Sequence, residues 1–139
     1  MGSLIVTALL GATSLGPFWS TPGMDRRCAY RSDMKPVLAA VSLYIRDGPG
    51  MDVSRANQRF ARIAREMARV EADDGRPPGS ARVHALLFWA MADVERAIGL
   101  WDKYHDPETS NAWVFRAERN LHRAGVRLQR IRCGPGDEC

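Results

Sequence analysis

The sequence predicts an all-α fold, an antiparallel up-down four-helix bundle. From about residue 32 onward, apolar residues recur at alternating intervals of three and four, which is the period of an amphipathic helix. Stretches rich in glycine and proline interrupt this pattern, and no segment keeps the period of two that a half-buried strand requires. The 139 residues, 45% of them hydrophobic, are enough for one domain with a single core.

The first helix is predicted over residues 32–46. Ser32 is a suitable N-cap, because its hydroxyl oxygen can accept a hydrogen bond from a backbone N–H of the first turn. Pro36 then lies close to that first turn, where the lack of a backbone N–H is tolerated. The Asp-Gly-Pro-Gly run at 47–50 ends this helix.

Three further helices are predicted over residues 52–73, 80–104 and 107–132. A loop rich in glycine and proline separates the first two of these, and Asp106 followed by Pro107 is a good N-cap and first residue for the last helix. The seam predicted to face the core from the third helix consists of Leu87, Met91, Val94, Ile98 and Trp101. Four further aromatic residues of the last two helices are also assigned to the core, namely Phe88, Tyr104, Trp113 and Phe115.

The cysteines are placed where the predicted topology brings two of them together. Cys28 precedes the first helix and Cys133 lies in the last turn of the fourth, so both belong to the same end of the bundle. A Cys28–Cys133 disulfide would close a loop of about a hundred residues and stabilise the fold by roughly 4 kcal/mol. Cys139 could replace Cys133 as the partner, and three reduced thiols are the alternative.

Residues 1–24 form an uncharged, apolar segment that precedes the bundle of residues 25–139. The run at 4–10 is followed by small residues, as in a secretory signal, although no lysine or arginine precedes it. Export would agree with a disulfide and would make the protein extracytoplasmic or secreted. The alternatives are an arm that packs on the bundle and a cytoplasmic location.

Catalytic and metal-binding patterns are absent from the sequence. It contains no nucleophile elbow, no phosphate-binding glycine loop and no dinucleotide fingerprint. It also lacks the paired Glu-x-x-His motifs of di-metal carboxylate bundles, and its three histidines fall at different heights along the predicted helices. We therefore expect no enzyme activity, no metal, no cofactor and no small-molecule substrate.

The outer face of the third helix has the composition of an interface. Tryptophan is a preferred anchor of protein interfaces, and small neighbours allow another backbone to approach closely. The predicted partner-binding residues are Ala85, Trp89, Ala92, Arg96 and Gly99. The N-terminal segment, a second copy of the chain or a different protein could cover this face, unless the helices are splayed and Trp89 belongs to the core. The sequence thus favours a non-enzymatic binding or structural protein, such as an accessory subunit.

A row of arginines on the last helix favours a second function. The chain carries a formal net charge of +4, and the residues that could bind an anion are Arg116, Arg119, Arg123, Arg127 and Arg130. Their guanidinium groups could bind the phosphates of nucleic acid or of an anionic membrane surface. We expect no aromatic residue among them on which a base could stack, and a row of this kind is commonly only a solvated helix face.

Overall fold

The fold is all-α, as the sequence predicts. The computed structural model describes residues 22–132, with side chains from residue 27 onward, and this part contains helices and no strand. The elements are α2 (Pro22–Asp47), the short 3-10 helix η2 (Gly48–Gly50), α3 (Val53–Asp74), α4 (Ser80–Tyr104) and α5 (Pro107–Gln129). The predicted four-helix bundle is therefore confirmed for the described residues.

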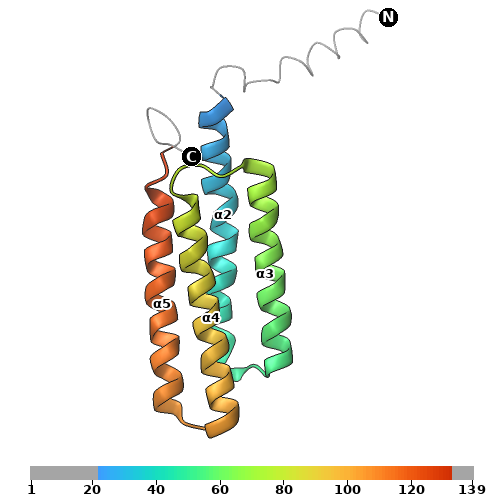
Figure 1. Cartoon of the computed structure of the whole chain (residues 1–139), viewed down its shortest axis with the longest axis vertical. Helices are drawn as coiled ribbons and strands as arrows, with labels where there is room; N and C mark the ends of the chain where they lie inside the picture. Colours follow the sequence, from blue (N-terminus) through green and yellow to red (C-terminus); the bar gives the residue numbers. More distant parts are fainter. Residues whose placement is uncertain (1–21, 133–139) are drawn as a thin grey trace, which may run out of the picture.

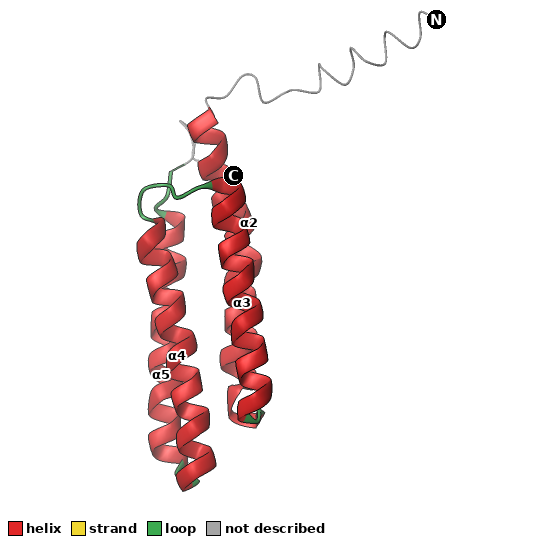
Figure 2. Ribbon diagram, turned by 45° about the vertical axis from the view of Figure 1, so that its right-hand side comes forward, coloured by secondary structure: helices red, strands yellow, loops and turns green. Residues whose placement is uncertain are grey.

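The four helices form two antiparallel pairs. Figure 1 shows that the connections between consecutive helices lie at alternate ends of the bundle, so the start of α2 and the end of α5 share one end. Figure 2 shows α2 beside α3 and α4 beside α5. The contact between α4 and α5 is the most extensive between any two of these helices.

Small side chains bring α4 and α5 close together. Ala90 on α4 and the α5 residues Ala117 and Ala124 are fully buried. The Ser110 hydroxyl on α5 donates a hydrogen bond to the backbone carbonyl of Ala97 on α4 over 3.0 Å. Alanine and serine add little volume, so the two backbones can approach, and the candidate site lies on this hairpin.

The larger core side chains come from α2, α3 and α4. They include Tyr30, Met34, Tyr44, Met67, Leu86, Leu87 and Met91, all fully or almost fully buried. The hydroxyl groups of both tyrosines are buried without a hydrogen-bond partner, and burial raises the pKa of each hydroxyl.

The prediction for the first helix is wrong at its start. α2 begins at Pro22, ten residues before Ser32, so Ser32 is not an N-cap and Pro36 lies inside the helix. Tyr30 and Met34, on either side of the predicted start, are both fully buried, and this packing compensates for the hydrogen bond that Pro36 cannot make. The predicted boundary at residue 24 therefore falls inside α2, whereas the signal-like run lies outside the described residues.

The other helices agree with their predicted bounds more closely. Asp52 caps α3 by accepting a hydrogen bond from the Arg55 amide, and Asp106 caps α5 by accepting one from the Glu108 amide. α5 ends at Gln129, three residues before the predicted end. Its last turn tightens into 3-10 hydrogen bonds, from the amide of Arg130 to the carbonyl of Arg127 and from that of Ile131 to that of Leu128.

The core assignment of several aromatic residues is also wrong. Phe88, Trp101, Tyr104 and Phe115 are 38%, 41%, 62% and 63% exposed, respectively. Figure 2 shows that the hairpin of α4 and α5 extends beyond the start of α3, so the last turn of α4 has few neighbours to cover it. No helix within residues 22–132 has an apolar stretch long enough to span a membrane.

Candidate partner-binding groove between α4 and α5

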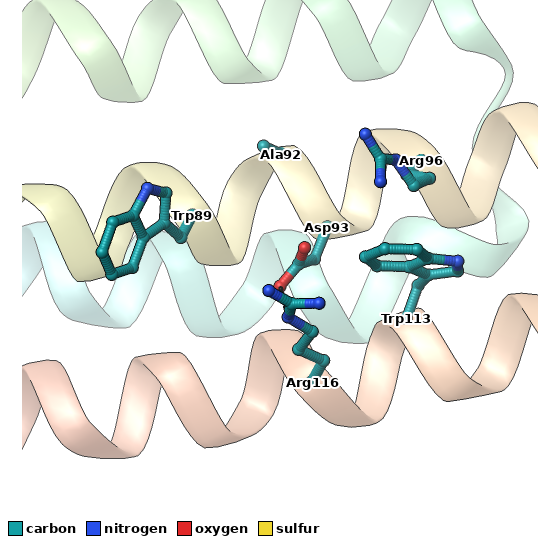
Figure 3. Close-up of a pocket in the computed structure, with 6 residues that line it drawn as sticks. All are labelled: Trp89, Ala92, Asp93, Arg96, Trp113 and Arg116. Atoms are coloured by element: carbon teal, nitrogen blue, oxygen red, sulfur yellow. Dashed lines mark ion pairs between the residues drawn. The ribbon is translucent and has the colours of Figure 1, made fainter.

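A groove of about 320 Å³ runs along the outer side of the α4 and α5 hairpin. It is lined by Trp89, Ala92, Asp93 and Arg96 from α4 and by Trp113 and Arg116 from α5. In Figure 3 the two tryptophans lie at opposite ends of this groove, with the Asp93 carboxylate and the Arg116 guanidinium between them. Three of the five predicted partner-binding residues therefore line one hollow together with residues from the next helix.

Trp89 is an exposed residue of this face. Its side chain is 49% exposed, so the alternative that it belongs to the core is wrong. The guanidinium of Arg82 lies 5.5 Å from the centre of its ring, which leaves much of the indole uncovered. Of the other predicted residues, Ala85 is half-buried and Gly99 is exposed, and neither lines the groove.

Trp113 lies against two arginines, one from each helix. The guanidinium carbon of Arg96 is 4.5 Å from the ring centre, and that of Arg116 is 5.3 Å away. Both distances fit cation–π contacts, which restrict the guanidinium groups to positions at the groove. The prediction that Trp113 belongs to the core did not include this role. The available signal was the i,i+3 spacing of Trp113 and Arg116 on the polar side of the last helix.

Asp93 is a buried carboxylate in the wall of the groove. Its Oδ2 atom accepts a hydrogen bond from Asn120 Nδ2 over 3.1 Å and lies 3.7 Å from Arg116 Nε. Burial raises the pKa of Asp93, and Arg116, the Asn120 hydrogen bond and Arg96 oppose this effect. Asp93 could not be selected from the sequence alone, because it lies beside the apolar seam of α4.

Arg96 differs from Arg116 in its charge partner. Arg116 is paired with Asp93, whereas no carboxylate among the described residues lies within ion-pair distance of Arg96. Arg96 is exposed, and its guanidinium N–H groups can donate to an external acceptor. One carboxylate and two guanidinium groups give the groove a formal charge of +1.

All five arginines of the predicted anion-binding row are exposed, but they do not share one environment. Arg116 belongs to the groove, and Arg130 lies at the far end of α5. The expectation that no aromatic residue lies among them is wrong. The guanidinium of Arg119 is 5.9 Å from the ring centre of Phe115, and both residues line a hollow with Arg123.

A second polar cluster connects α2, α3 and α4. The ring of His84 stacks on that of Tyr30 with 5.8 Å between centres, and His84 Nδ1 lies 3.4 Å from Glu71 Oε2. Burial lowers the pKa of His84, although Glu71 opposes this effect. Glu71 also pairs with Arg76 at 2.6 Å. Within residues 22–132 no group of three or more His, Cys, Asp or Glu side chains could hold a metal ion.

The predicted disulfide involves one described cysteine. Cys28 is half-buried on the first turns of α2, while Cys133 lies outside the described residues, as does Cys139. Nearby, Arg31 Nη1 on α2 donates to the backbone carbonyl of Ile131 over 3.1 Å. This hydrogen bond brings the chain two residues before Cys133 close to the chain three residues after Cys28.

Comparisons with other proteins leave this groove to be interpreted on its chemistry alone. No family model, no curated protein and no solved structure matches the chain.

Proposed function

We propose that this chain is a non-enzymatic binding protein, an accessory subunit that docks through the groove between α4 and α5 onto an acidic segment of another protein. The observation that carries the proposal is the half-exposed Trp89 at one end of a groove whose other end is formed by Trp113 and Arg96. A large apolar ring beside an arginine without a carboxylate partner is the composition of an interface hot spot.

The chemistry of the partner follows from the charges in the groove. A carboxylate of the partner could accept hydrogen bonds from Arg96, whose guanidinium the Trp113 ring already restricts. An apolar side chain about 10 Å further along the same segment could cover the exposed part of Trp89, because Trp89 and Arg96 lie seven residues apart on α4. The Asp93 carboxylate attracts lysine or arginine of a partner only weakly, because Arg116 already pairs with it. An acidic amphipathic segment therefore complements the groove best.

The test uses two synthetic amphipathic peptides and the full chain. One peptide carries glutamate and aspartate beside leucine and phenylalanine, and the other has the acids replaced by glutamine and asparagine. We expect the full chain to bind the acidic peptide at least tenfold more tightly in fluorescence polarisation. Equal affinity for both peptides, or no binding of either, would contradict the assignment of an acidic partner.

Substitutions then locate the binding surface. Trp89→Asp and Arg96→Gln should each weaken binding of the acidic peptide at least tenfold, which corresponds to about 1.4 kcal/mol. Trp101→Asp is the matched control, because Trp101 is 41% exposed on the same helix and lies outside the groove lining. An equal loss in the Trp101 and Trp89 variants would show that the groove is not the binding surface.

The same variants test whether a second copy of the chain occupies the groove. Sedimentation of the full chain at micromolar concentration should show the same molecular mass for the wild type and for Trp89→Asp. A dimer that dissociates on this substitution would overturn the proposal of a foreign acidic partner and assign the face to self-association.

Anion binding by the arginine row on α5 is the second candidate function, and the position of Phe115 favours it. This ring is 63% exposed beside Arg119, so it offers a stacking surface that the sequence did not suggest. Replacing Arg119, Arg123 and Arg127 by Gln should then remove salt-dependent retention on heparin and on anionic phospholipid. Unchanged retention would identify the row as a solvated helix face.

We also propose that Cys28 and Cys133 form a disulfide and that the protein works outside the reducing cytoplasm. The hydrogen bond from Arg31 to the Ile131 carbonyl supports the pairing, because it holds the two chain segments together beside the cysteines. Alkylation of the natively produced protein without reductant, followed by intact mass and peptide mapping, tests it. One alkylated cysteine, Cys139, is the expected result, whereas three alkylated cysteines or a Cys28–Cys139 bridge would refute it.

A further inference from the structure

A second hollow lies at the end of the bundle where α2 begins and α5 ends. It has a volume of about 240 Å³ and is lined by Arg27, Pro78, Arg130, Ile131 and Arg132. Three guanidinium-bearing residues, one from α2 and two from the segment that follows α5, thus meet at one hollow, some distance from the groove at Trp113. Only Arg130 belongs to the arginine row predicted from the sequence.

The backbone beside these arginines is held in place from two sides. Ile131 is buried, with 4% of its surface exposed, and its carbonyl accepts the hydrogen bond from Arg31 on α2. Its Cγ1 atom lies 3.6 Å from the position that a Cβ atom of Gly79 would occupy, so Ile131 also packs against the start of α4. Because Ile131 is fixed, Arg130 and Arg132 on either side of it are kept at the hollow.

The hollow carries positive charge without a counter-charge among the described residues. No carboxylate of residues 27–132 lies within ion-pair distance of Arg27, Arg130 or Arg132. The positive end of α4 begins just after Pro78, and the negative end of α5 lies beside Arg130, so the two helix dipoles oppose each other here. The charge of the hollow therefore comes from its arginines.

We propose that this hollow binds a phosphate group. Each planar guanidinium can donate two hydrogen bonds to two oxygens of a tetrahedral oxyanion. Three guanidinium groups can therefore together donate hydrogen bonds to all of the oxygens that face them. Three positive charges close together repel one another until an anion neutralises them. A multiply charged phosphate neutralises more of this charge than a singly charged carboxylate and should therefore bind more tightly. The site is independent of the groove between α4 and α5.

Calorimetry of the full chain with inorganic phosphate and pyrophosphate at low ionic strength tests the proposal. We expect binding of both anions, and Arg27→Gln and Arg132→Gln should each weaken it at least tenfold. Arg65→Gln is the matched control, because it removes the same charge from an exposed position of α3 outside the hollow, and it should weaken binding less than twofold. The absence of binding, or an equal loss in all three variants, would overturn the proposal.

The phosphate group could be free or could belong to a lipid headgroup, and a vesicle assay separates these sources. Phosphatidylcholine vesicles with phosphatidic acid are compared with vesicles that carry the same charge as phosphatidylserine. Preference for phosphatidic acid, lost in Arg132→Gln and competed by pyrophosphate, would assign the site to a lipid phosphate. Anion binding in calorimetry without that preference would assign it to a soluble phosphate. Vesicle binding that Arg27→Gln and Arg132→Gln leave unchanged would show that the hollow does not recognise the headgroup.

Discussion

Asn120 on α5 donates a hydrogen bond from Nδ2 to the Oδ2 atom of Asp93 on α4 over 3.1 Å, and both side chains are buried. This pair connects the two helices that form the groove. Arg116 approaches the same carboxylate oxygen from the exposed side at 3.7 Å. Asn120 is therefore the neutral, buried partner of a carboxylate that burial alone would tend to protonate.

Replacing Asn120 by Ala should destabilise the fold more at pH 7 than at pH 4. Burial raises the pKa of Asp93, and the hydrogen bond from Asn120 lowers it. Removing that hydrogen bond in Asn120→Ala therefore raises the pKa of Asp93 further. The buried carboxylate then loses a donor at pH 7, which costs about 2 kcal/mol, and this cost falls toward about 1 kcal/mol as the carboxyl group takes up its proton in acid. Urea unfolding at both pH values measures the difference.

Arg116→Gln is the control for the Asn120 variant, because Arg116 meets the same oxygen from an exposed position. Its loss should stay below about 1 kcal/mol at pH 7. Equal destabilisation of the Asn120 variant at the two pH values would contradict a charged Asp93 in the native state.

Replacing Asp74 by Asn should stabilise the protein at pH 8 and have little effect near pH 4. Burial, a hydrogen bond with the Asp33 carboxyl and the charges of Asp33 and Asp73 raise the pKa of Asp74 from 3.8 to about 6. A raised carboxyl pKa means that the native state takes up a proton between pH 4 and 6, so this group's contribution to stability is lost as the pH rises through 6. After solvent screening, about 1 kcal/mol should separate the variant from the wild type at pH 8.

Thermal unfolding from pH 4 to pH 8 measures this effect. Asp102→Asn is the control, since Asp102 is exposed in the last turn of α4, at the opposite end of that helix from Asp74, and it should leave the pH profile nearly unchanged. A profile of the Asp74 variant that runs parallel to that of the wild type would show that Asp74 does not titrate in this range.

Replacing Gly48 by Ala should destabilise the fold by about 2 kcal/mol, because there is no room for a methyl group in η2. A Cβ atom at Gly48 would lie 2.7 Å from Cγ1 of Val94. In a Val94→Ala background the same substitution should cost less than half as much, since the clashing atom is gone. Unfolding in guanidinium chloride of the two single variants and the double variant gives the coupling free energy between residues 48 and 94. Strictly additive losses of unfolding free energy would contradict the clash.

The sequence predicts the helices after residue 52 well, because their signals are local. The caps Asp52 and Asp106 accept the expected backbone hydrogen bonds, and Gly75 and Gly79 supply the positive φ angles of the loop between α3 and α4. The start of α2 was not predictable in this way. Local rules place the start of a helix near Pro36, and the packing of Tyr30 and Met34 that extends α2 is a tertiary property.

The part of the candidate site on α4 could be predicted from the sequence, whereas the part on α5 could not, because its position depends on tertiary packing. Trp89 and Arg96 share a face of one helix, which the 3.6-residue period shows directly. Trp113 and Arg116 join them only because α4 and α5 pack closely and at a particular rotation. That rotation depends on small buried residues such as Ala117 and on the Ser110 hydrogen bond, which a single sequence does not reveal.

The hydrogen bond between Arg31 and the Ile131 carbonyl has a consequence for the order in which the protein folds during synthesis. It joins residues 100 positions apart, near the two limits of the described chain. The hairpin of α2 and α3 can form while the ribosome is still translating α4, but this end of the bundle cannot close until residue 131 has left the exit tunnel. Until then α2 lacks its contact with the segment around Ile131, and a chain shortened before Ile131 would never gain it.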